Sequence, residues 1–169
     1  MMNKLTLLVR DEEGMTLVEL LAVIVILSIV AAIGGVAIAG VIQRSREDAR
    51  VADVQMLYEA ATLAESSDSY ISKQKAPVTA GGSKTDITAK DLNDQNYATS
   101  VGFLMAADGK TSTATNVVFK LVPSATGGAD KLTISIPKES TFAGSKPNAD
   151  FMDKEAKDVK GLTRGDFFK

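Results

Sequence analysis

The chain contains no cysteine and no histidine among its 169 residues. Without cysteine it forms no disulfide and offers no thiolate as a metal ligand or nucleophile. Without histidine it lacks the commonest general base and the commonest metal ligand. Many familiar catalytic and metal sites are therefore excluded, and we expect neither an enzyme nor a bound cofactor or metal.

An excess of charge of either sign is also missing. The chain has 19 basic and 21 acidic side chains, which gives a net charge of -2. Proteins that bind nucleic acid through its phosphates usually carry a clear basic excess. Nucleic acid is therefore not the expected partner, and the length suits one domain with an appended element.

The longest uncharged stretch is LLAVIVILSIVAAIGGVAIAGVI, residues 20–42, in which Ser28 is the only polar side chain. As a helix it would be roughly 35 Å long, enough to cross a hydrocarbon core of about 30 Å. A buried helix of a large soluble protein would need more surrounding chain than remains here. We therefore predict a transmembrane helix.

The polar segment MMNKLTLLVRDEEG precedes this stretch and ends in Gly14. A secretory signal peptide has a shorter apolar region, and its cleavage site follows that region. Here the order is reversed. A cut after Gly14 would leave the hydrophobic helix on the mature protein.

The sequence GMTLVELLAVIVIL, residues 14–27, resembles the signature of type IV pilins, pseudopilins and competence pilins. In that family a membrane aspartyl peptidase removes a short leader after its terminal glycine and commonly methylates the new N-terminus. The resemblance implies a leader at residues 1–14 that ends in Gly14, and N-methylation at Met15. Met15 stands where the family most often has phenylalanine.

The resemblance also implies a role in filament assembly for Glu19, the fifth residue of the mature chain. A carboxylate at the bilayer centre costs about 3 kcal/mol, whereas one near a helix N-terminus is favoured by about 0.3 to 1 kcal/mol. An interfacial glutamate that reaches water would explain why the charge is tolerated but not why it is placed there. In the family, this glutamate pairs with the free α-ammonium of a neighbouring subunit.

The family usually has a proline near the position of Val36, and this helix has Gly34 and Gly35 just before it. Each glycine weakens a helix by about 1 kcal/mol relative to alanine. One interpretation is close packing between membrane helices. The other is a segment that loosens or melts when subunits enter a filament.

Basic residues lie on both sides of the apolar stretch and do not fix its orientation by the positive-inside rule. Two precede it and three follow it closely, namely Lys4, Arg10, Arg44, Arg46 and Arg50. The resemblance, and not the charge, implies a cytoplasmic leader.

Helical periodicity continues beyond the apolar stretch and must end before Pro77. One stripe, expected to be core, contains Val51, Val54, Leu57, Tyr58, Ala61 and Ala64. A narrower stripe contains Met56, Leu63 and Tyr70, and it is either core or a subunit contact.

Further on, the period changes to two, which predicts half-buried strands. Val117, Phe119 and Leu121 share one face; so do Leu132, Ile134 and Ile136, with Thr133 and Ser135 opposite. Residues 123–130 would join these strands as a hairpin, and residues 100–106 would form a third strand before an Asp108-Gly109 turn.

Thr88 and Asp91 have capping-box spacing, which predicts a short helix after Thr88. Beyond Ser140 the pattern favours only a short helix around residues 151–159 and a loose, solvated end. The family often closes this region with a disulfide, which this chain does not form, so core packing or a bound ion would have to hold it.

Two other motifs fail as ligand sites. The sequence DGKT, residues 108–111, lacks the earlier glycine of a phosphate loop, because Leu104 occupies that position. The sequence DLNDQN, residues 91–96, lacks the glycine and the distal glutamate of a calcium loop.

The expected fold is α+β, with one long N-terminal helix on a small antiparallel sheet. Residues 15–42 would form its transmembrane or filament-core half, residues 43–74 its amphipathic half, and residues 75–169 a globular head. The resemblance implies a structural subunit of a type IV pilus-like filament. Its alternatives are a pseudopilin of a type II secretion or competence DNA-uptake system, or a minor pilin.

The partners that the resemblance implies are prepilin peptidase, other copies of the chain, minor pilins, and the assembly platform with its motor ATPase. Membrane lipid would surround the helix before assembly. The chain would cross the inner membrane once before assembly and lie in a cell-surface filament afterwards.

Overall fold

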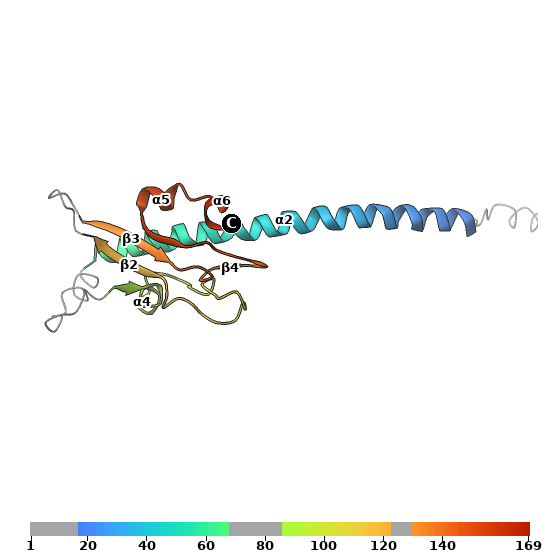
Figure 1. The fold of residues 1–169 in the computed structure, drawn as a ribbon. Helices are drawn as coiled ribbons and strands as arrows, with labels where there is room; N and C mark the ends of the chain where they lie inside the picture. Colours follow the sequence, from blue (N-terminus) through green and yellow to red (C-terminus); the bar gives the residue numbers. More distant parts are fainter. Residues whose placement is uncertain (1–16, 68–85, 123–129) are drawn as a thin grey trace, which may run out of the picture. The chain divides into compact units, whose positions relative to one another are not determined.

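The computed structural model describes residues 17–67, 86–122 and 130–169. The chain divides into two compact units, Met1–Ile42 and Gln43–Lys169, which are described separately. Helix α2, Leu17–Glu65, is continuous through both (blue to green in Figure 1). The described part of the first unit consists of the first half of this helix.

The second unit contains a four-stranded antiparallel sheet in the order β1-β2-β3-β6. Its strands are β1 (Ile87–Thr88), β2 (Val118–Val122), β3 (Lys131–Ile136) and β6 (Phe151–Glu155). A separate two-stranded hairpin consists of β4 (Phe142–Ala143) and β5 (Lys146–Pro147). The short helices are α4 (Ala89–Asp94), α5 (Ala156–Lys160) and α6 (Arg164–Phe167).

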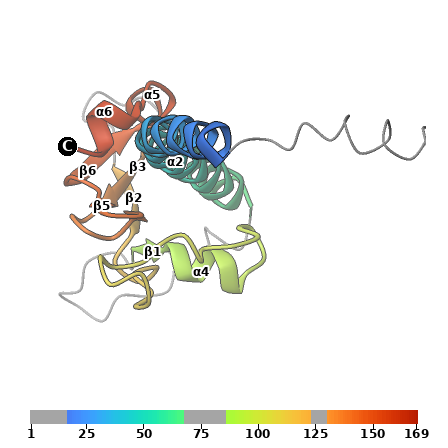
Figure 2. The same ribbon diagram turned by 90° about the vertical axis from the view of Figure 1, so that its right-hand side faces the viewer.

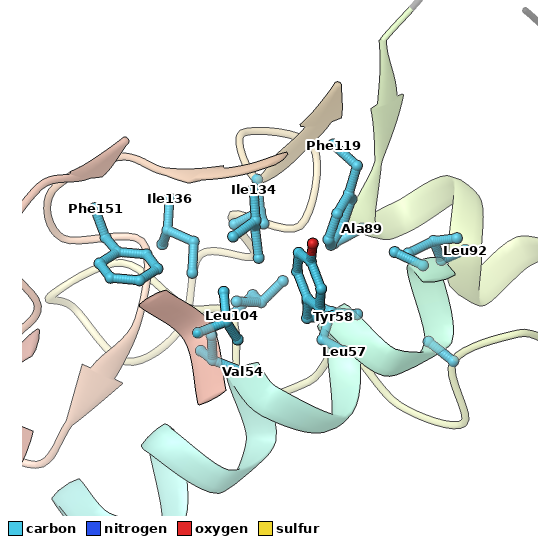
Figure 3. Packing of buried hydrophobic residues seen from close by; sticks show 14 of the residues in the cluster. Val54, Leu57, Tyr58, Ala89, Leu92, Leu104, Phe119, Ile134, Ile136 and Phe151 are labelled. Carbon is cyan, nitrogen blue, oxygen red and sulfur yellow. The ribbon is translucent and has the colours of Figure 1, made fainter. Parts of the chain in front are cut away.

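One face of the sheet packs on the second-unit part of α2. The predicted core stripe is buried throughout, at Val51, Val54, Leu57, Tyr58, Ala61 and Ala64. Side chains from the sheet point toward this stripe, among them Phe119 and Ile134 (Figure 3). Tyr58 also donates a hydrogen bond to the Leu132 carbonyl oxygen at 2.7 Å. The predicted α+β class is therefore confirmed.

The predicted β2–β3 pairing is confirmed, with Phe119 opposite Ile134. The linker that joins the two strands lies almost wholly at residues 123–129, outside the described residues. The prediction that this strand is half-buried was wrong, because Thr133 and Ser135, on the face opposite Ile134, are only 5% and 4% exposed. β3 lies between β2 and β6, and its buried hydroxyls donate hydrogen bonds to the Lys120 carbonyl and the Asp153 carboxylate.

The short helix predicted after Thr88 is confirmed as α4. Thr88 is its N-cap, and the hydroxyl of Thr88 accepts a hydrogen bond from the backbone N–H of Asp91 at 3.2 Å. The Asp91 carboxylate accepts in return from the Thr88 backbone N–H at 3.1 Å. This reciprocal capping satisfies two N–H groups that a helix start leaves without intrahelical partners. Figure 2 shows α4 beside β1.

The third strand predicted at residues 100–106 is wrong. Only Met105 in this segment pairs, in an isolated bridge with Ser112. The segment turns earlier, where the Leu104 N–H donates to the Val101 carbonyl at 3.0 Å. Its apolar residues are nearly consecutive and do not alternate, so they do not define the two faces of a strand.

The predicted Asp108-Gly109 turn is present. The Asp108 carboxylate accepts from the N–H groups of Lys110 and Thr111 at 2.8 and 2.9 Å. Gly109 has a φ of 64°, a conformation that glycine adopts without steric cost. The turn is therefore set by local side-chain chemistry.

The C-terminal prediction needs two corrections. Residues 151–159, expected to be one short helix, divide into strand β6 and helix α5. The end of the chain is packed and not loose, because Phe167 and Phe168 are 0% and 2% exposed. The Phe167 ring meets those of Phe151 and Phe168 edge to face, at centroid distances of 5.7 and 4.9 Å. The charged residues around these three phenylalanines led to the wrong prediction of a solvated end.

Helices α5 and α6 lie beside α2 (Figures 1 and 2). Gln55 of α2 donates to the Val159 carbonyl at 3.2 Å, and Asp48 lies 3.7 Å from Arg164. These contacts attach the C-terminal segment to the helix. The final residues of the chain therefore help to hold the second unit together.

Helix α2 ends at Glu65, earlier than the expected end at residue 74. Beyond this end, the hydroxyls of Ser66 and Ser67 donate hydrogen bonds to the carbonyls of Leu63 and Ala64, each at 2.8 Å. Such side-chain bonds compete with helix continuation. Residues 68–74, including Tyr70 of the narrower stripe, lie outside the described residues.

The carboxyl group of Glu65 lies near the end of this helix in an unfavourable setting for a charge. Partial burial, together with the nearby Asp130 carboxylate, raises its pKa above the ordinary value of 4.5. A raised pKa favours the protonated form in the folded chain. This contribution to stability is present below about pH 4.5 and is lost as the pH rises through the folded pKa.

We predict that Glu65→Gln stabilises the folded chain at pH 7 by less than about 1 kcal/mol. The gain should vanish below pH 4, because Glu65 is then protonated in both the folded and unfolded states. Urea unfolding of the full chain in mild detergent, at pH 7 and below pH 4, measures the change in the free energy of unfolding. Glu59→Gln, on the exposed side of α2, is the control. A gain that is the same at both pH values would contradict this explanation.

Candidate membrane-anchoring and processing segment

The first half of α2 is apolar on all sides. No residue from 17 to 42 is buried within the chain, and its large apolar side chains are 47–87% exposed. Its most apolar 18-residue window has a mean hydropathy of 2.9. By length and composition this segment is able to cross a membrane. A helix that is hydrophobic all round needs lipid or other apolar helices around it.

From residue 20 to residue 42, the one polar side chain of the helix has a hydrogen-bond partner. Ser28 is the only polar residue there, and its hydroxyl donates to the Ile24 carbonyl at 2.7 Å, one turn earlier. A serine that bonds back to the preceding turn satisfies its donor within the helix itself. The segment is therefore compatible with a hydrocarbon environment along its length.

Glu19 lies in the first turn of α2, which begins at Leu17. A carboxylate at this end of a helix faces the positive end of the helix dipole and the N–H groups of the first turn. Gly14 and Met15 lie outside the described residues. The structure therefore places only Glu19 among the three residues that the prepilin signature marks.

Gly34 and Gly35 lie within uninterrupted helix. A Cβ atom added at either position would meet nothing within 4 Å. Contacts among the described residues therefore do not require glycine at these positions. The glycine pair therefore affects helix stability or contacts with other molecules, and not packing among the described residues.

The structure shows a polar cluster at the start of the second unit that sequence reasoning missed. Gln43 donates to the Ala143 carbonyl at 2.7 Å, and Arg50 donates to the Phe142 carbonyl at 3.2 Å. Both carbonyls belong to the β4–β5 hairpin. We call Gln43, Glu47 and Arg50, together with hairpin residues 142–147, the hairpin clamp.

Glu47 is the most buried member of α2 in the hairpin clamp, at 5% exposed. Its carboxylate accepts a hydrogen bond from Gln43 at 2.9 Å and lies 3.7 Å from the Lys146 ammonium. A buried charge needs such partners to remain stable. The sequence did contain a signal for the burial of Glu47. Glu47 lies four residues before Val51 and so extends the buried stripe by one turn.

The tip of the hairpin lies close to α2 at Gly144. This residue has a φ of 72°, and an added Cβ would lie 2.9 Å from both Arg46 Nη1 and Gln43 Oε1. Glycine is needed here because of its left-handed backbone, whereas the nearby atoms are the ends of flexible side chains that can shift. The absence of a side chain leaves room for the Arg46 guanidinium over the hairpin.

We predict that Gly144→Ala destabilises the chain by about 1 to 3 kcal/mol, since the alanine would adopt a strained backbone and displace Arg46 or Gln43. Urea unfolding measures the loss. Gly165→Ala in α6 is the control, because its added Cβ would have only Thr163 nearby, at 3.9 Å, and a helical glycine gains from this change. Equal stability of Gly144→Ala and the parent chain would show that the tip does not need glycine.

The carboxylates of the described residues do not gather into a metal-binding group. No group of three or more Asp or Glu side chains within the described ranges is placed to hold a metal ion. In residues 91–96, the Asp91 carboxylate caps α4 and Asp94 pairs with Lys90. These contacts account for the acidic residues of that segment as parts of a capped helix.

One family model matches the chain, the prokaryotic N-terminal methylation motif, at residues 9–35. The matched region includes Gly14, Met15 and Glu19 and continues into the apolar half of α2. No curated protein and no solved structure matches the chain. The motif is the prepilin signature of type IV pilins, and it indicates that the chain is a type IV pilin-like or pseudopilin precursor.

Proposed function

We propose that this chain is the precursor of a structural subunit of a type IV pilus-like filament. The observation that carries the proposal is the apolar segment at residues 17–42, which is exposed on all sides and lies within and just after the methylation motif. The segment needs lipid before assembly and the helices of other subunits afterwards. A membrane anchor and a filament core are two uses of the same surface.

Processing would divide the chain between Gly14 and Met15. A prepilin peptidase removes the leader, residues 1–14, and methylates the amino group of Met15. This cut would leave the whole described length of α2, Leu17–Glu65, on the mature chain. The motif spans the cut, beginning at residue 9 and ending at residue 35.

Assembly would then use residues 15–42 as the filament core and the rest of α2, which ends at Glu65, as the amphipathic half of the helix. Residues 75–169 would form the head. Repeated head-to-tail contacts between identical chains generate an open fibre when the rotation does not close. An assembly platform and a motor ATPase would move each subunit from the membrane into the fibre, together with any minor pilins.

Glu19 would give this packing its register. Its carboxylate would pair with the α-ammonium of Met15 in a neighbouring subunit, so that two groups costly to bury neutralise each other. Support comes from the matched motif, residues 9–35, which includes Met15 and Glu19, and from the position of Glu19 in the first turn of α2. Mispaired subunits would leave both charges buried without partners.

Gly34 and Gly35 would form the segment of the helix that loosens during assembly. Support comes from the low helix propensity of glycine and from the lack, among the described residues, of any packing contact at either Cβ position. The test is the structure of the filament at high resolution. Unwound or stretched backbone around the pair agrees with the proposal, and regular helix from Leu27 to Ile42 contradicts it.

The abundance of the chain in filaments tests the proposed function. Fibres sheared from cells and analysed by mass spectrometry should contain this chain as their dominant protein. Trace amounts would instead support a minor pilin. Absence from fibres, with the chain retained in the membrane, would contradict the filament role and favour a pseudopilin or a membrane anchor.

A further inference from the structure

We propose that Arg44 and Arg46, here called the arginine pair, bind the headgroups of anionic phospholipids at the membrane surface. The proposal rests on the membrane insertion of residues 17–42 and not on filament assembly. It assigns a lipid partner to the part of α2 that immediately follows the apolar segment.

The arginine pair carries charge that nearby carboxylates leave unneutralised. The neighbouring basic side chains have acidic partners: Arg50 with Asp53 at 2.9 Å, Lys146 with Glu47 at 3.7 Å, and Arg164 with Asp48 at 3.7 Å. Arg44 and Arg46 are exposed and form no ion pair within the part of the chain that the structure describes. Their guanidinium groups are therefore available to an external anion.

The position of the arginine pair along α2 matches the depth of lipid phosphates. The apolar run ends at Ile42, and α2 continues as regular helix past Arg46. At about 1.5 Å per residue, Arg44 and Arg46 lie roughly 3 and 6 Å further along the axis. The polar headgroup layer on each side of a bilayer is about 5 to 7 Å thick. Both side chains therefore reach the headgroup layer when the apolar run fills the hydrocarbon core.

The chemistry of the pair favours phosphate over other headgroup atoms. A guanidinium presents a planar fork of N–H donors that fits two oxygens of one phosphate, and it stays charged at any physiological pH. Zwitterionic lipids offset the phosphate with a cationic amine, whereas anionic lipids leave its charge uncompensated. Anionic phospholipid is therefore the preferred partner.

The two arginines would bind separate lipids. Residues two apart on a helix point about 200° away from each other, so Arg44 and Arg46 lie on nearly opposite sides of α2. Arg46 extends beside the hairpin tip, because a Cβ on Gly144 would lie 2.9 Å from its Nη1. Two headgroups on opposite sides would fix the depth of the helix in the membrane.

The test uses the full chain in nanodiscs that contain phosphatidylcholine and phosphatidylglycerol at three to one. Native mass spectrometry of the released chain measures which lipids stay bound. We expect the parent chain to retain phosphatidylglycerol in excess of its share, and Arg44→Gln/Arg46→Gln to lose this enrichment, by about fivefold for each arginine.

The control is Lys110→Gln/Lys138→Gln, which removes the same charge from two exposed positions of the second unit. It should keep the enrichment of the parent chain. Unchanged enrichment in the arginine variant, or an equal loss in the lysine variant, would overturn the proposal. Circular dichroism of each variant in the nanodisc checks that its helix and sheet are retained.

The outcomes also separate this inference from the proposed function. Filaments formed by a chain without lipid enrichment would overturn the lipid contact alone. Enrichment in a chain that forms no filaments would overturn the filament role alone. Failure of the parent chain to enter the nanodisc would overturn the membrane insertion on which both depend.

Discussion

Glu19→Ala should abolish the incorporation of the chain into filaments and leave leader removal intact. The variant retains Gly14 and Met15, the residues of the proposed cleavage site. It lacks the carboxylate that would neutralise the α-ammonium of a neighbouring subunit in the filament core. One buried charge left without its partner costs about 3 to 5 kcal/mol, a factor of more than a hundred in each subunit contact.

Two measurements follow the Glu19 variant. Immunoblots report the size of the chain in the membrane, and electron microscopy of the sheared fraction reports the fibres. Glu59→Ala is the matched control, because it removes an exposed glutamate from the second-unit part of the same helix. Normal fibres from Glu19→Ala would refute the role of the carboxylate in assembly. A retained leader would refute the claim that leader removal does not need Glu19.

Phe119→Ala should destabilise the second unit by about 3 to 5 kcal/mol. Phe119 is 0% exposed, lies opposite Ile134 in the β2–β3 register, and points toward the Tyr58 ring of α2 (Figure 3). Its removal would leave a cavity between the sheet and the helix that the fixed backbone of both elements prevents from closing. Such a loss is a large part of the stability of a domain of this size.

Urea unfolding of the full chain in mild detergent, followed by circular dichroism, measures the change. Val122→Ala is the control, because Val122 ends the same strand and is 44% exposed. We expect its cost to be below about 1 kcal/mol. A Phe119→Ala variant that is no less stable than the control would show that this ring is not central to the core.

Local periodicity explains why the helix stripe and the β2–β3 pair were predictable. The positions of Val54, Leu57 and Ala61 identify one helix face, and those of Phe119 and Ile134 identify alternating strand faces. The capping-box spacing of Thr88 and Asp91 likewise predicted the capped start of α4. Each of these features depends on residues close together in the sequence.

Contacts between distant segments explain the errors. Nothing near Thr133 or Ser135 in the sequence indicates that β6 will pair beside them and keep their hydroxyls buried. The burial of Phe167 depends on Phe151 and on the placement of α6, which local patterns do not report. A run of apolar residues around Leu104 likewise filled the core without forming a strand.

The candidate site divides in the same way. The prepilin signature is read directly from residues 14–27, because a peptidase recognises a short, continuous segment. The hairpin clamp and the arginine pair require the structure, since Gln43 meets Ala143 across 100 positions of sequence separation. The ion pairs of Lys146 with Glu47 and of Arg164 with Asp48, which also join distant segments, show which charges after Ile42 have partners.

The mass of the chain in purified filaments distinguishes a processed filament subunit from an unprocessed membrane anchor. We predict that the filament subunit begins at Met15, carries one added methyl group at its amino terminus and contains the whole described length of α2. A filament chain that retains residues 1–14, or a mature chain cut within the apolar segment, would contradict it.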